Sequence, residues 1–386
     1  MRIGIDYTSA ITQGAGIGRY TRELVAAILA QQAQHEYVLF FASGELAPEL
    51  PGLRQLEQLR VQYPQLRTCA IPLAPRRLTQ LWHRLRVPLP IELLTGKLDI
   101  VHAPDFVPPP SFAPSIVTIH DLSYMVHPKY ALPSVARYLR AAVPRGLRRA
   151  TAILADSQAT QRDLQTYLDI DPQRVTVVYP GVGPQFRPLP ADIVREQLKD
   201  LQLPERFLLF VSTIEPRKNL VRLFEAYAQV REQLGNMKLV LGGRRGWMYA
   251  DVFAAIERLG LHDHIRLLDY VDDKLLPALY NAAWAFVYPS VYEGFGIPAL
   301  EALACATPVL TANNSSLPEV VGNVAVLVQA EQVESIAEGL IRIVSDQALR
   351  TRLRNLGPQQ AAPFSWDAAA KQLLDVYRLV QAKPQG

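Results

Sequence analysis

The amino-acid sequence predicts an α/β protein with two doubly wound domains, each built on a parallel sheet. The chain has 386 residues, and at roughly 150 residues per domain this length suits two domains. Short apolar runs recur through both halves, and amphipathic segments lie between them. Unbroken apolar runs are typical of strands buried on both faces of a parallel sheet. We expect the two domains to face each other across a cleft lined by the carboxyl ends of the strands.

The predicted strands and helices alternate twice along the chain. The predicted strands of the first half are residues 2–6, 37–42, 100–102, 116–119, 152–155 and 175–179. Those of the second half are residues 207–212, 238–241, 265–268, 285–288, 307–310 and 324–327. Helices are predicted at 19–31, 219–234, 275–283 and 298–304. Such alternation indicates parallel sheets with helical crossovers.

Prolines mark the boundary between the predicted domains. Pro180, Pro184, Pro188 and Pro190 interrupt regular structure around residues 181–203. We therefore predict a first domain at 1–185 and a second at 186–365. The tail at 366–386 has helical spacing. It is expected to pack back on the first domain, with packing on the second as the alternative.

Composition narrows the class of protein. Hydrophobic residues make up 49% and charged residues 20%, which is ordinary for a globular protein. No apolar run reaches the roughly 20 residues that span a bilayer, and the N-terminus does not have the pattern of a signal peptide. Cys69 and Cys305 form neither a disulfide framework nor a metal-ligand spacing. These features favour a cytoplasmic protein.

Positive charge is concentrated in the first half. Residues 1–187 hold 20 Lys and Arg against 14 Asp and Glu, and the remainder holds 20 against 22. This excess favours an anionic partner or peripheral contact with a membrane surface, although an ordinary solvated surface is an equal alternative. No zinc spacing, aromatic strand motif or basic arm indicates a nucleic-acid partner.

One basic stretch has the pattern of an amphipathic helix. Residues 76–86 contain four arginines and no acid. Leu78, Leu81, Trp82 and Leu85 fall on one helical face. Such a face can mark an interfacial membrane helix, and the alternative is a helix that packs its apolar side on the domain core.

The strongest motif combines two glutamates with two glycines. Gly294 and Gly296 allow a tight turn after the strand 285–288, and Pro298 suits the first turn of a helix. Free backbone N–H groups at 298–300 would then stabilise an anion. The carboxylates of Glu293 and Glu301 can accept hydrogen bonds from hydroxyl groups of a ligand. The alternative is that Glu293 is a solvated loop residue and that Glu301 only interacts favourably with the helix dipole. The motif reads Glu293-Gly294-Phe295-Gly296-Ile297-Pro298-Ala299-Leu300-Glu301.

Two cations precede a helix in the second motif, Arg217-Lys218-Asn219. Asn219 suits an N-cap. Cations at the N-terminal end of a helix are repelled by the helix dipole. A diphosphate between the cations and the helix would remove this repulsion. Two exposed surface cations are the alternative.

A glycine loop and a polar pair follow strands of the first half. Gly14, Gly16 and Gly18 precede the helix 19–31, but Arg19 replaces the third glycine of a dinucleotide fingerprint. A flexible loop over the cleft therefore fits better than a dinucleotide site, and a plain tight turn is the alternative.

His120 and Asp121 follow the strand 116–119, where polar residues reach a cleft. Alternatively, the histidine bonds a backbone group and Asp121 caps a turn. His102 and Asp105 follow another strand, and we predict no metal site from these four residues.

Together these residues resemble the retaining glycosyltransferases of GT-B architecture, family 4, which includes many mannosyl- and glucosyltransferases. The resemblance runs over nearly the whole chain and is strongest at 208–327. It is carried by the Arg-Lys-Asn segment, the Glu-x7-Glu element, and the segments Thr307-Pro308-Val309 and Ser316-Leu317-Pro318-Glu319. Ser212 stands where many relatives have glycine, and Cys305-Ala306 where Cys-Gly is usual.

The resemblance implies a role for each matching residue. Arg217 and Lys218 resemble the pair that binds the donor diphosphate and stabilises the leaving group. Glu293 resembles the ligand of the transferred sugar, and Glu301 the ligand of the ribose. His120, with Asp121 beside it, resembles the residue that reaches the donor sugar. The remaining predicted donor-binding residues are Gly14, Gly16, Gly18, Gly296, Ile297 and Pro298.

The implied reaction transfers a hexosyl unit with retention of configuration and without a required metal or cofactor. GDP-mannose is the first expected donor and UDP-glucose the second, with a glycan or lipid-linked acceptor. A nucleotide-sugar epimerase, a phosphorylase and a non-catalytic nucleotide-sugar sensor are the alternatives.

Overall fold

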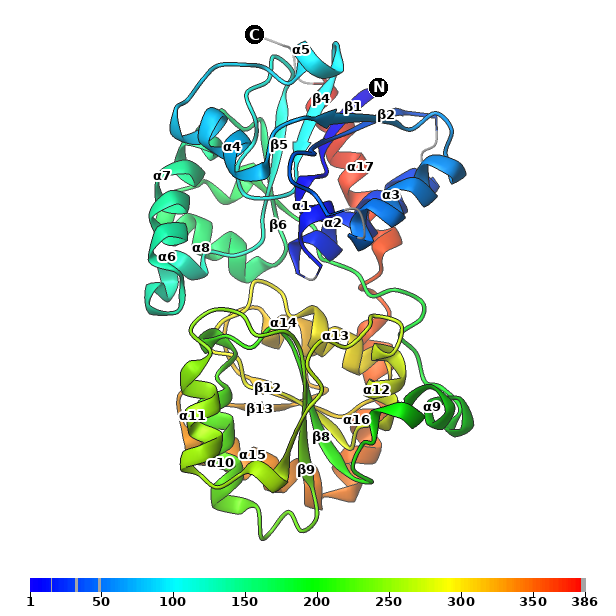
Figure 1. Ribbon diagram of the computed structural model, residues 1–386, viewed down its shortest axis with the longest axis vertical. Helices are drawn as coiled ribbons and strands as arrows, with labels where there is room; N and C mark the ends of the chain where they lie inside the picture. The colour runs from blue at the N-terminus through cyan, green and yellow to red at the C-terminus, as the bar shows by residue number, and fades with distance from the viewer. Residues whose placement is uncertain (15, 32–33, 48–49, 383–386) are drawn as a thin grey trace. The chain divides into compact units, whose positions relative to one another are not determined.

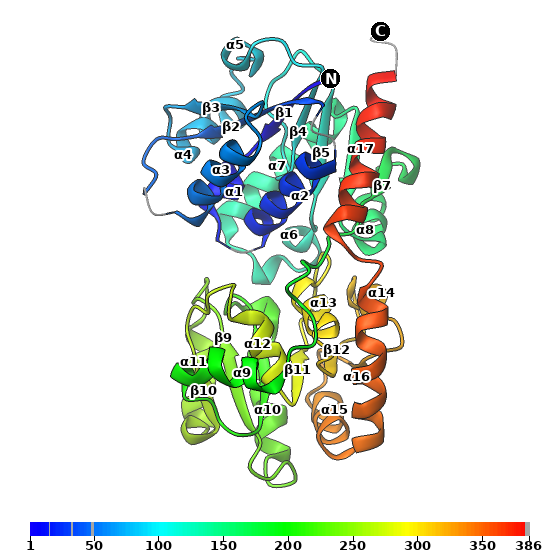
Figure 2. The ribbon, with the colours of Figure 1, turned by 90° about the vertical axis from the view of Figure 1, so that its right-hand side faces the viewer.

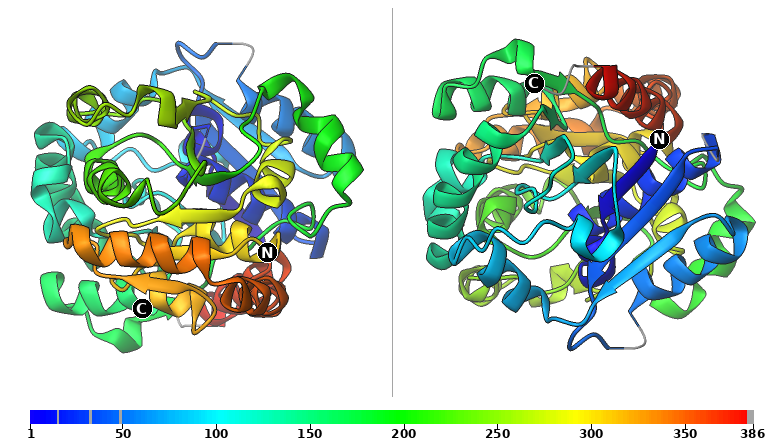
Figure 3. Two further views of the ribbon diagram at one scale, coloured as in Figure 1. Left: turned by 90° about the horizontal axis from the view of Figure 1, so that it is seen from below. Right: turned by 90° about the horizontal axis from the view of Figure 1, so that it is seen from above.

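The computed structural model describes residues 1–14, 16–31, 34–47 and 50–382 and divides into two compact units. Unit 1 comprises Met1–Val126, Pro133–Gly181 and Ser365–Gly386, and unit 2 comprises His127–Leu132 and Val182–Phe364. Ala15 of the glycine loop lies outside the described residues. The division falls just after Gly181, and a short segment before α7 belongs to unit 2. Helices lie on both faces of the sheet in each unit (Figures 1 and 3).

Unit 1 is built on a parallel sheet of seven strands within the described residues, in the order β3-β2-β1-β4-β5-β6-β7. Its strands are β1 (Arg2–Asp6), β2 (Glu36–Ala42), β3 (Arg67–Ile71), β4 (Ile100–Ala103), β5 (Ser115–Ile119), β6 (Ala152–Ala155) and β7 (Val175–Val177). Its helices are α1 (Thr8–Thr12), α2 (Ile17–Gln31), α3 (Pro51–Gln62), α4 (Pro75–Thr79), α5 (Glu92–Thr95), α6 (Ser123–Val126), α7 (Pro133–Arg149), α8 (Gln158–Leu168) and α17 (Trp366–Ala382). The sequence did not predict β3.

Unit 2 has a parallel sheet of six strands within the described residues, in the order β10-β9-β8-β11-β12-β13. Its strands are β8 (Phe207–Val211), β9 (Lys238–Gly242), β10 (Ile265–Leu267), β11 (Ala285–Tyr288), β12 (Val309–Ala312) and β13 (Val326–Val328). Its helices are α9 (Ala191–Leu198), α10 (Leu220–Val230), α11 (Ala250–Arg258), α12 (Leu276–Ala282), α13 (Ile297–Ala304), α14 (Leu317–Val321), α15 (Val333–Ser345) and α16 (Gln347–Ala361).

In both sheets the first strand lies inside the sheet, and the strand order reverses beside it. The reversal falls between β1 and β4 in unit 1 and between β8 and β11 in unit 2. Because ligands of open α/β sheets bind outside the carboxyl ends of strands at such a reversal, these two edges are where chemistry is expected. The predicted fold class, two units that are each built on a doubly wound parallel sheet, is confirmed.

The C-terminal helix α17 belongs to the core of unit 1. Trp366, Leu373 and Tyr377 are buried in a cluster with residues of β1 and α2, and α17 runs along unit 1 in Figure 2. Tyr377 also contacts β4, because its hydroxyl lies 2.9 Å from Nδ1 of His102. The segment that completes unit 1 therefore comes from the opposite end of the chain.

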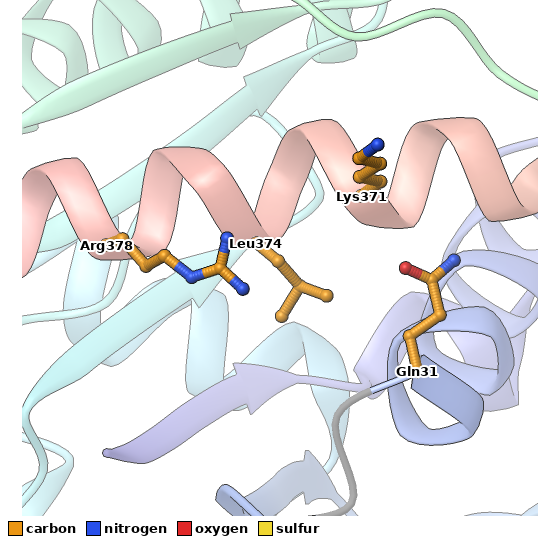
Figure 4. Close-up of a pocket in the computed structure, with 4 residues that line it drawn as sticks. All are labelled: Gln31, Lys371, Leu374 and Arg378. Carbon is orange, nitrogen blue, oxygen red and sulfur yellow. The ribbon is translucent and has the colours of Figure 1, made fainter.

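A surface hollow lies between the end of α2 and α17. Gln31, Lys371, Leu374 and Arg378 line it (Figure 4). None of these residues is a predicted site residue, so this hollow is separate from the candidate site.

The basic stretch 76–86 departs from the predicted regular helix. It forms α4 followed by a π-helix, η1 (Gln80–Arg84), in which the N–H of Leu85 donates to the oxygen of Gln80. This wider turn rotates the following residues off the predicted face. Leu78 and Trp82 are buried in the core, but Leu85 is 72% exposed. The alternative that the apolar face packs on the domain core therefore holds for Leu78 and Trp82 but not for Leu85.

We predict that Leu373→Ala destabilises unit 1 by about 2–5 kcal/mol, because it removes a fully buried side chain of α17. Urea unfolding followed by circular dichroism measures this loss. Leu379→Ala on the same helix is the matched control, since Leu379 is 66% exposed, and we expect it to change stability by less than about 0.5 kcal/mol. Equal losses in the two variants would contradict the packing of α17.

Candidate functional site

The candidate site of unit 2 lies at the carboxyl ends of β8 and β11. These strands are parallel neighbours, with Leu209 paired to Phe286. The chain after β8 leads into a 3₁₀ turn, Pro216–Lys218, and the chain after β11 forms the loop before α13. Because both loops leave the sheet at the same edge, they bring the two cations of one motif to the glutamate of the other.

A buried network of charges joins the two loops. Oε2 of Glu293 accepts a 2.8 Å hydrogen bond from Nη1 of Arg217, and Oε1 accepts one of 2.7 Å from Nζ of Lys218. Lys218 also donates to the Tyr288 hydroxyl at 2.8 Å, and Nη2 of Arg217 donates to Glu215 at 2.7 Å. Lys218, Glu293 and Glu215 are all buried. The structure thus confirms that these two motifs meet.

The charges of this network stabilise one another. Burial alone would raise the pKa of Glu293, but Arg217 and Lys218 lower it to about 2. Burial and the neighbouring Arg217 oppose the charge of Lys218, yet Glu293 and other partners raise its pKa above the ordinary value. Burial, with Glu293 nearby, raises the pKa of Tyr288 to about 12. The carboxylate and both cations are therefore ionised at neutral pH, and the phenol is neutral.

Two serines after β12 hold the loop that carries Glu293. The backbone N–H of Glu293 donates to Oγ of Ser315 at 3.0 Å. Oγ of Ser316 lies 2.8 Å from the backbone oxygens of both Glu293 and Phe295. Sequence analysis assigned these serines no role in positioning the glutamate.

The start of α13 differs from the prediction. Gly296 has φ +110°, and a Cβ there would lie 2.8 Å from Leu317, so a glycine is required. The predicted free N–H groups at 298–300 are absent: Pro298 has no N–H, and the N–H groups of Ala299 and Leu300 donate to the oxygen of Gly296. At this site, the groups that can bind an anion are the side chains of Arg217 and Lys218, which come from the turn after β8.

Glu301 and Asn219 have buried surroundings of their own. Oε2 of Glu301 accepts a 3.0 Å hydrogen bond from the Tyr280 hydroxyl on α12. Asn219 occupies the predicted N-cap position of α10, but its side chain makes no capping hydrogen bond. Its Oδ1 accepts a 2.9 Å hydrogen bond from Nη1 of Arg222, and its amide nitrogen donates to the oxygens of Pro289 and Ala330. Asn219 therefore ties the loops after β8, β11 and β13 together.

In unit 1, three neighbouring strands place polar groups around His120. Nδ1 of His120 lies 2.7 Å from Oδ2 of Asp156, the residue after β6. Nε2 lies 2.7 Å from the oxygen of Pro104, the residue after β4. Asp156 is not among the predicted site residues, although it follows a buried strand directly, which is the same signal that indicates His120.

His120 is held as a cation. Both ring nitrogens face oxygen acceptors, so both carry protons. Burial alone would lower the pKa of His120, but Asp156 and the other acceptors raise it to about 9. Asp121, by contrast, accepts a 2.8 Å hydrogen bond from the N–H of Ser123 and caps a turn. The turn-capping interpretation of Asp121 therefore fits its geometry.

The glycine loop after α1 is fixed at its ends. A Cβ on Gly18 would lie 2.1 Å from the oxygen of Gln13, and Gly16 has φ +57°. The buried Arg22 donates to the oxygens of Gln13 and Gly14, both at 2.8 Å. Among the residues that the structure describes, no heavy atom beyond the chain neighbours lies within 4 Å of the Cβ position of Gly14 or Gly16. The loop therefore has an anchored base and open space at two glycines.

His102 is a structural residue of the core. Its Nε2 lies 3.0 Å from the Thr118 hydroxyl, and burial together with His120 lowers its pKa to about 3. Within residues 1–14, 16–31, 34–47 and 50–382, no group of three or more His, Cys, Asp or Glu side chains is arranged to hold a metal ion.

Two family models and one relative match this chain closely. The model of glycosyl transferases group 1 matches residues 194–360, and that of glycosyltransferase family 4 matches residues 14–186. The O-antigen chain mannosyltransferase B of Escherichia coli is 32% identical over 378 residues, covering 95% of this chain and 96% of the relative. The chain is a family-4 glycosyltransferase. The enzyme also resembles the D-inositol 3-phosphate glycosyltransferase of Salinispora tropica, at 37% identity over 59% of this chain and 51% of that one.

Solved structures show the same architecture for this glycosyltransferase. A sucrose-phosphate synthase from Thermosynechococcus elongatus matches with a TM-score of 0.78 at 21% identity, covering 99% of both chains. Anabaena HepE in complex with UDP and glucose matches with a TM-score of 0.77 at 18% identity, covering 98% of this chain and 100% of that one. At these identities the likeness supports the fold alone.

We predict that Asp156→Asn lowers the pKa of His120 from about 9, because it removes the interaction that raises this pKa most, while Asp105 and the Pro104 oxygen still oppose the effect of burial. NMR titration of ¹⁵N-labelled histidine measures it. In the wild type, the stabilisation from the raised pKa is complete below about pH 6.5 and disappears as pH rises through about 9. Asp169→Asn, at the exposed end of α8, is the matched control. An unchanged titration in Asp156→Asn would show that the ion pair is not formed.

Proposed function

We propose that this enzyme transfers a hexosyl unit, with retention of anomeric configuration, from a nucleotide diphosphate sugar to a glycan or lipid-linked acceptor. The observation that carries the proposal is the meeting of Arg217, Lys218 and Glu293 at the strand-order reversal of unit 2. Two cations suit a diphosphate, and a carboxylate suits sugar hydroxyls.

The geometry of Lys218 supports phosphate binding. An ammonium group has three protons to donate, and within the described residues two of them are directed to Glu293 and Tyr288. These two hydrogen bonds fix the direction of the third N–H group of Lys218. Arg217 supplies a planar guanidinium, which can bind two phosphate oxygens. We propose that these cations stabilise the negative charge that develops on the departing diphosphate, a role that a metal ion has in other transferases.

The surroundings of Glu293 support front-face transfer rather than a covalent sugar intermediate. Both of its oxygens accept hydrogen bonds from cations, and its pKa is about 2. Such a carboxylate is a weak nucleophile and a weak base. We therefore propose that Glu293 holds hydroxyl groups of the transferred sugar, and that the departing phosphate assists the attack.

Mannose is the proposed sugar, with GDP-mannose as donor and UDP-glucose as the second candidate. The E. coli relative that matches nearly the whole chain is named a mannosyltransferase. Among the structural neighbours, HepE was solved with UDP and glucose. We also propose Glu301 as the ribose ligand, with Gly296, Ile297 and Pro298 near the donor.

In unit 1, His120 stays proposed as a ligand of the donor sugar, with Asp121 beside it. For Nε2 to bind a sugar hydroxyl, it has to exchange the Pro104 oxygen for that hydroxyl. The open space at Gly14 and Gly16 supports their proposed place near phosphates and acceptor, and Gly18 shapes the loop.

We predict that Arg217→Ala with Lys218→Ala weakens binding of GDP and UDP roughly 100-fold or more, because two charge-assisted contacts are lost. Isothermal titration calorimetry measures the affinity. Lys238→Ala with Arg266→Ala removes the same charge at exposed positions of unit 2, and we expect it to bind normally. If the Arg217→Ala, Lys218→Ala variant is folded and still binds GDP and UDP with wild-type affinity, the diphosphate does not bind at these two residues.

Product analysis tests the reaction itself. With GDP-mannose and a mannosylated acceptor, we expect free GDP to appear in equal amount to glycosylated acceptor, and the new bond to keep the anomeric configuration of the donor. NMR of the product determines that configuration. An inverted product, or interconversion of the nucleotide sugar without acceptor, would contradict the proposal.

A further inference from the structure

One face of unit 1 concentrates positive charge. Residues 75–97 and α7 together hold ten Lys and Arg and one Asp or Glu, whereas the whole chain holds 40 and 36. Within the described residues, none of their nine arginines forms a salt bridge with a carboxylate. The single acid, Glu92, is bonded to the loop at Ser111 and Ala113. This charge is therefore not neutralised within the face.

The two basic segments lie side by side. The ring of His83 in η1 lies 6.4 Å from that of Tyr138 in α7, and the guanidinium of Arg84 lies 6.0 Å from the Tyr138 ring. Burial first, and then Arg149 and Arg145 of α7, lower the pKa of His83 to about 4. The arginines of α7 therefore act on the region of η1, and α4 and α7 are neighbours in the ribbon (Figure 1).

Large apolar side chains are exposed beside these arginines. Leu85 is 72% exposed, Leu93 63% and Phe112 78%. One loop connects Phe112 to α5 and α7: the N–H of Phe112 donates to the Glu92 side chain at the start of α5, and Nη2 of Arg149 donates to the oxygen of Pro109, earlier in the same loop. Leu85 follows η1, which contacts Tyr138 of α7. These exposed side chains, together with arginines that have no carboxylate partner within the described residues, form a mixed apolar and cationic face.

We propose that unit 1 docks on an anionic lipid surface through the face formed by residues 76–94, Phe112 and the arginines of α7. Arginines next to large apolar side chains fit the boundary between lipid headgroups and acyl chains, where the cations meet phosphates and the apolar groups leave water. A nucleic acid or polyanionic glycan would use the charge but would leave Leu85 and Leu93 in water. The proposal is independent of the donor site, because all of its residues lie in unit 1 and outside the network of Glu293.

Cosedimentation of the full-length chain with lipid vesicles tests the proposal. We expect binding to vesicles of phosphatidylcholine with phosphatidylglycerol, weak binding to phosphatidylcholine alone, and loss of binding at high salt. The triple variant Arg76→Gln, Arg77→Gln and Arg86→Gln should weaken vesicle binding roughly 100-fold, because each cation near the surface contributes about 1 kcal/mol of binding free energy. Leu85→Ser with Phe112→Ser should also weaken binding, and the remaining binding should become more sensitive to salt.

Matched controls separate this face from general charge. Arg195→Gln with Arg266→Gln and Arg352→Gln removes three exposed arginines of unit 2 and should leave vesicle binding unchanged. Thermal unfolding and GDP binding verify that each variant is folded. Absence of wild-type binding to anionic vesicles, equal losses in the two triple variants, or binding of the wild type to heparin or DNA with none to vesicles would each overturn the proposal. An unaffected serine variant would overturn the contribution of the apolar side chains.

Discussion

The Glu293 carboxylate lies between the guanidinium of Arg217 and the ammonium of Lys218, and the surrounding loops of unit 2 are arranged to maintain that contact. Removing three charges from water is unfavourable unless each finds a partner. Here the strand order provides those partners, because β8 and β11 are neighbours and their loops leave the sheet together. A buried ion network of this kind adds little net stability compared with apolar packing. We therefore attribute the role of this ion network in the enzyme to ligand binding rather than to stability.

Unit 1 applies the same geometry with a different set of residues. Three neighbouring strands, β4, β5 and β6, end beside one another, and the residue after each contributes one group of the Pro104–His120–Asp156 arrangement. In unit 2 two cations enclose a carboxylate, whereas in unit 1 two oxygen acceptors enclose a cation. Both arrangements depend on parallel neighbours with a common direction, which places successive loops at one edge. The fold therefore determines which polar residues meet before any ligand is present.

Sequence alone predicted the strands with continuous apolar patterns and the motifs that follow them. It missed β3, whose sequence Arg67-Thr68-Cys69-Ala70-Ile71 is mixed in polarity because an edge strand is only partly buried. It also missed Asp156 and Glu215 as partners. The contact of Asp156 with His120 depends on which strands are neighbours, and that of Glu215 with Arg217 depends on how the turn after β8 folds. Neither is encoded in the spacing of a motif. Asn219 is at the predicted N-cap position, but its side chain makes no capping hydrogen bond, because it is bonded to Arg222 and to the loops after β11 and β13.

The balance of charge in unit 2 constrains how a donor can bind. Arg217 and Lys218 are matched by Glu215 and Glu293, so the network has no net charge, and a diphosphate brought beside it makes the site negative. Binding is favourable under either of two conditions. The phosphate oxygens can accept hydrogen bonds from N–H groups that the carboxylates do not use, or Glu293 can accept hydrogen bonds from other donors when one of its two cations turns to the phosphate. Sugar hydroxyl groups are such donors. A nucleotide without its sugar would supply the negative charge but not those hydroxyls. The proposed roles of Glu293 and of the two cations are therefore coupled: recognition of the sugar favours recognition of the diphosphate through one shared carboxylate.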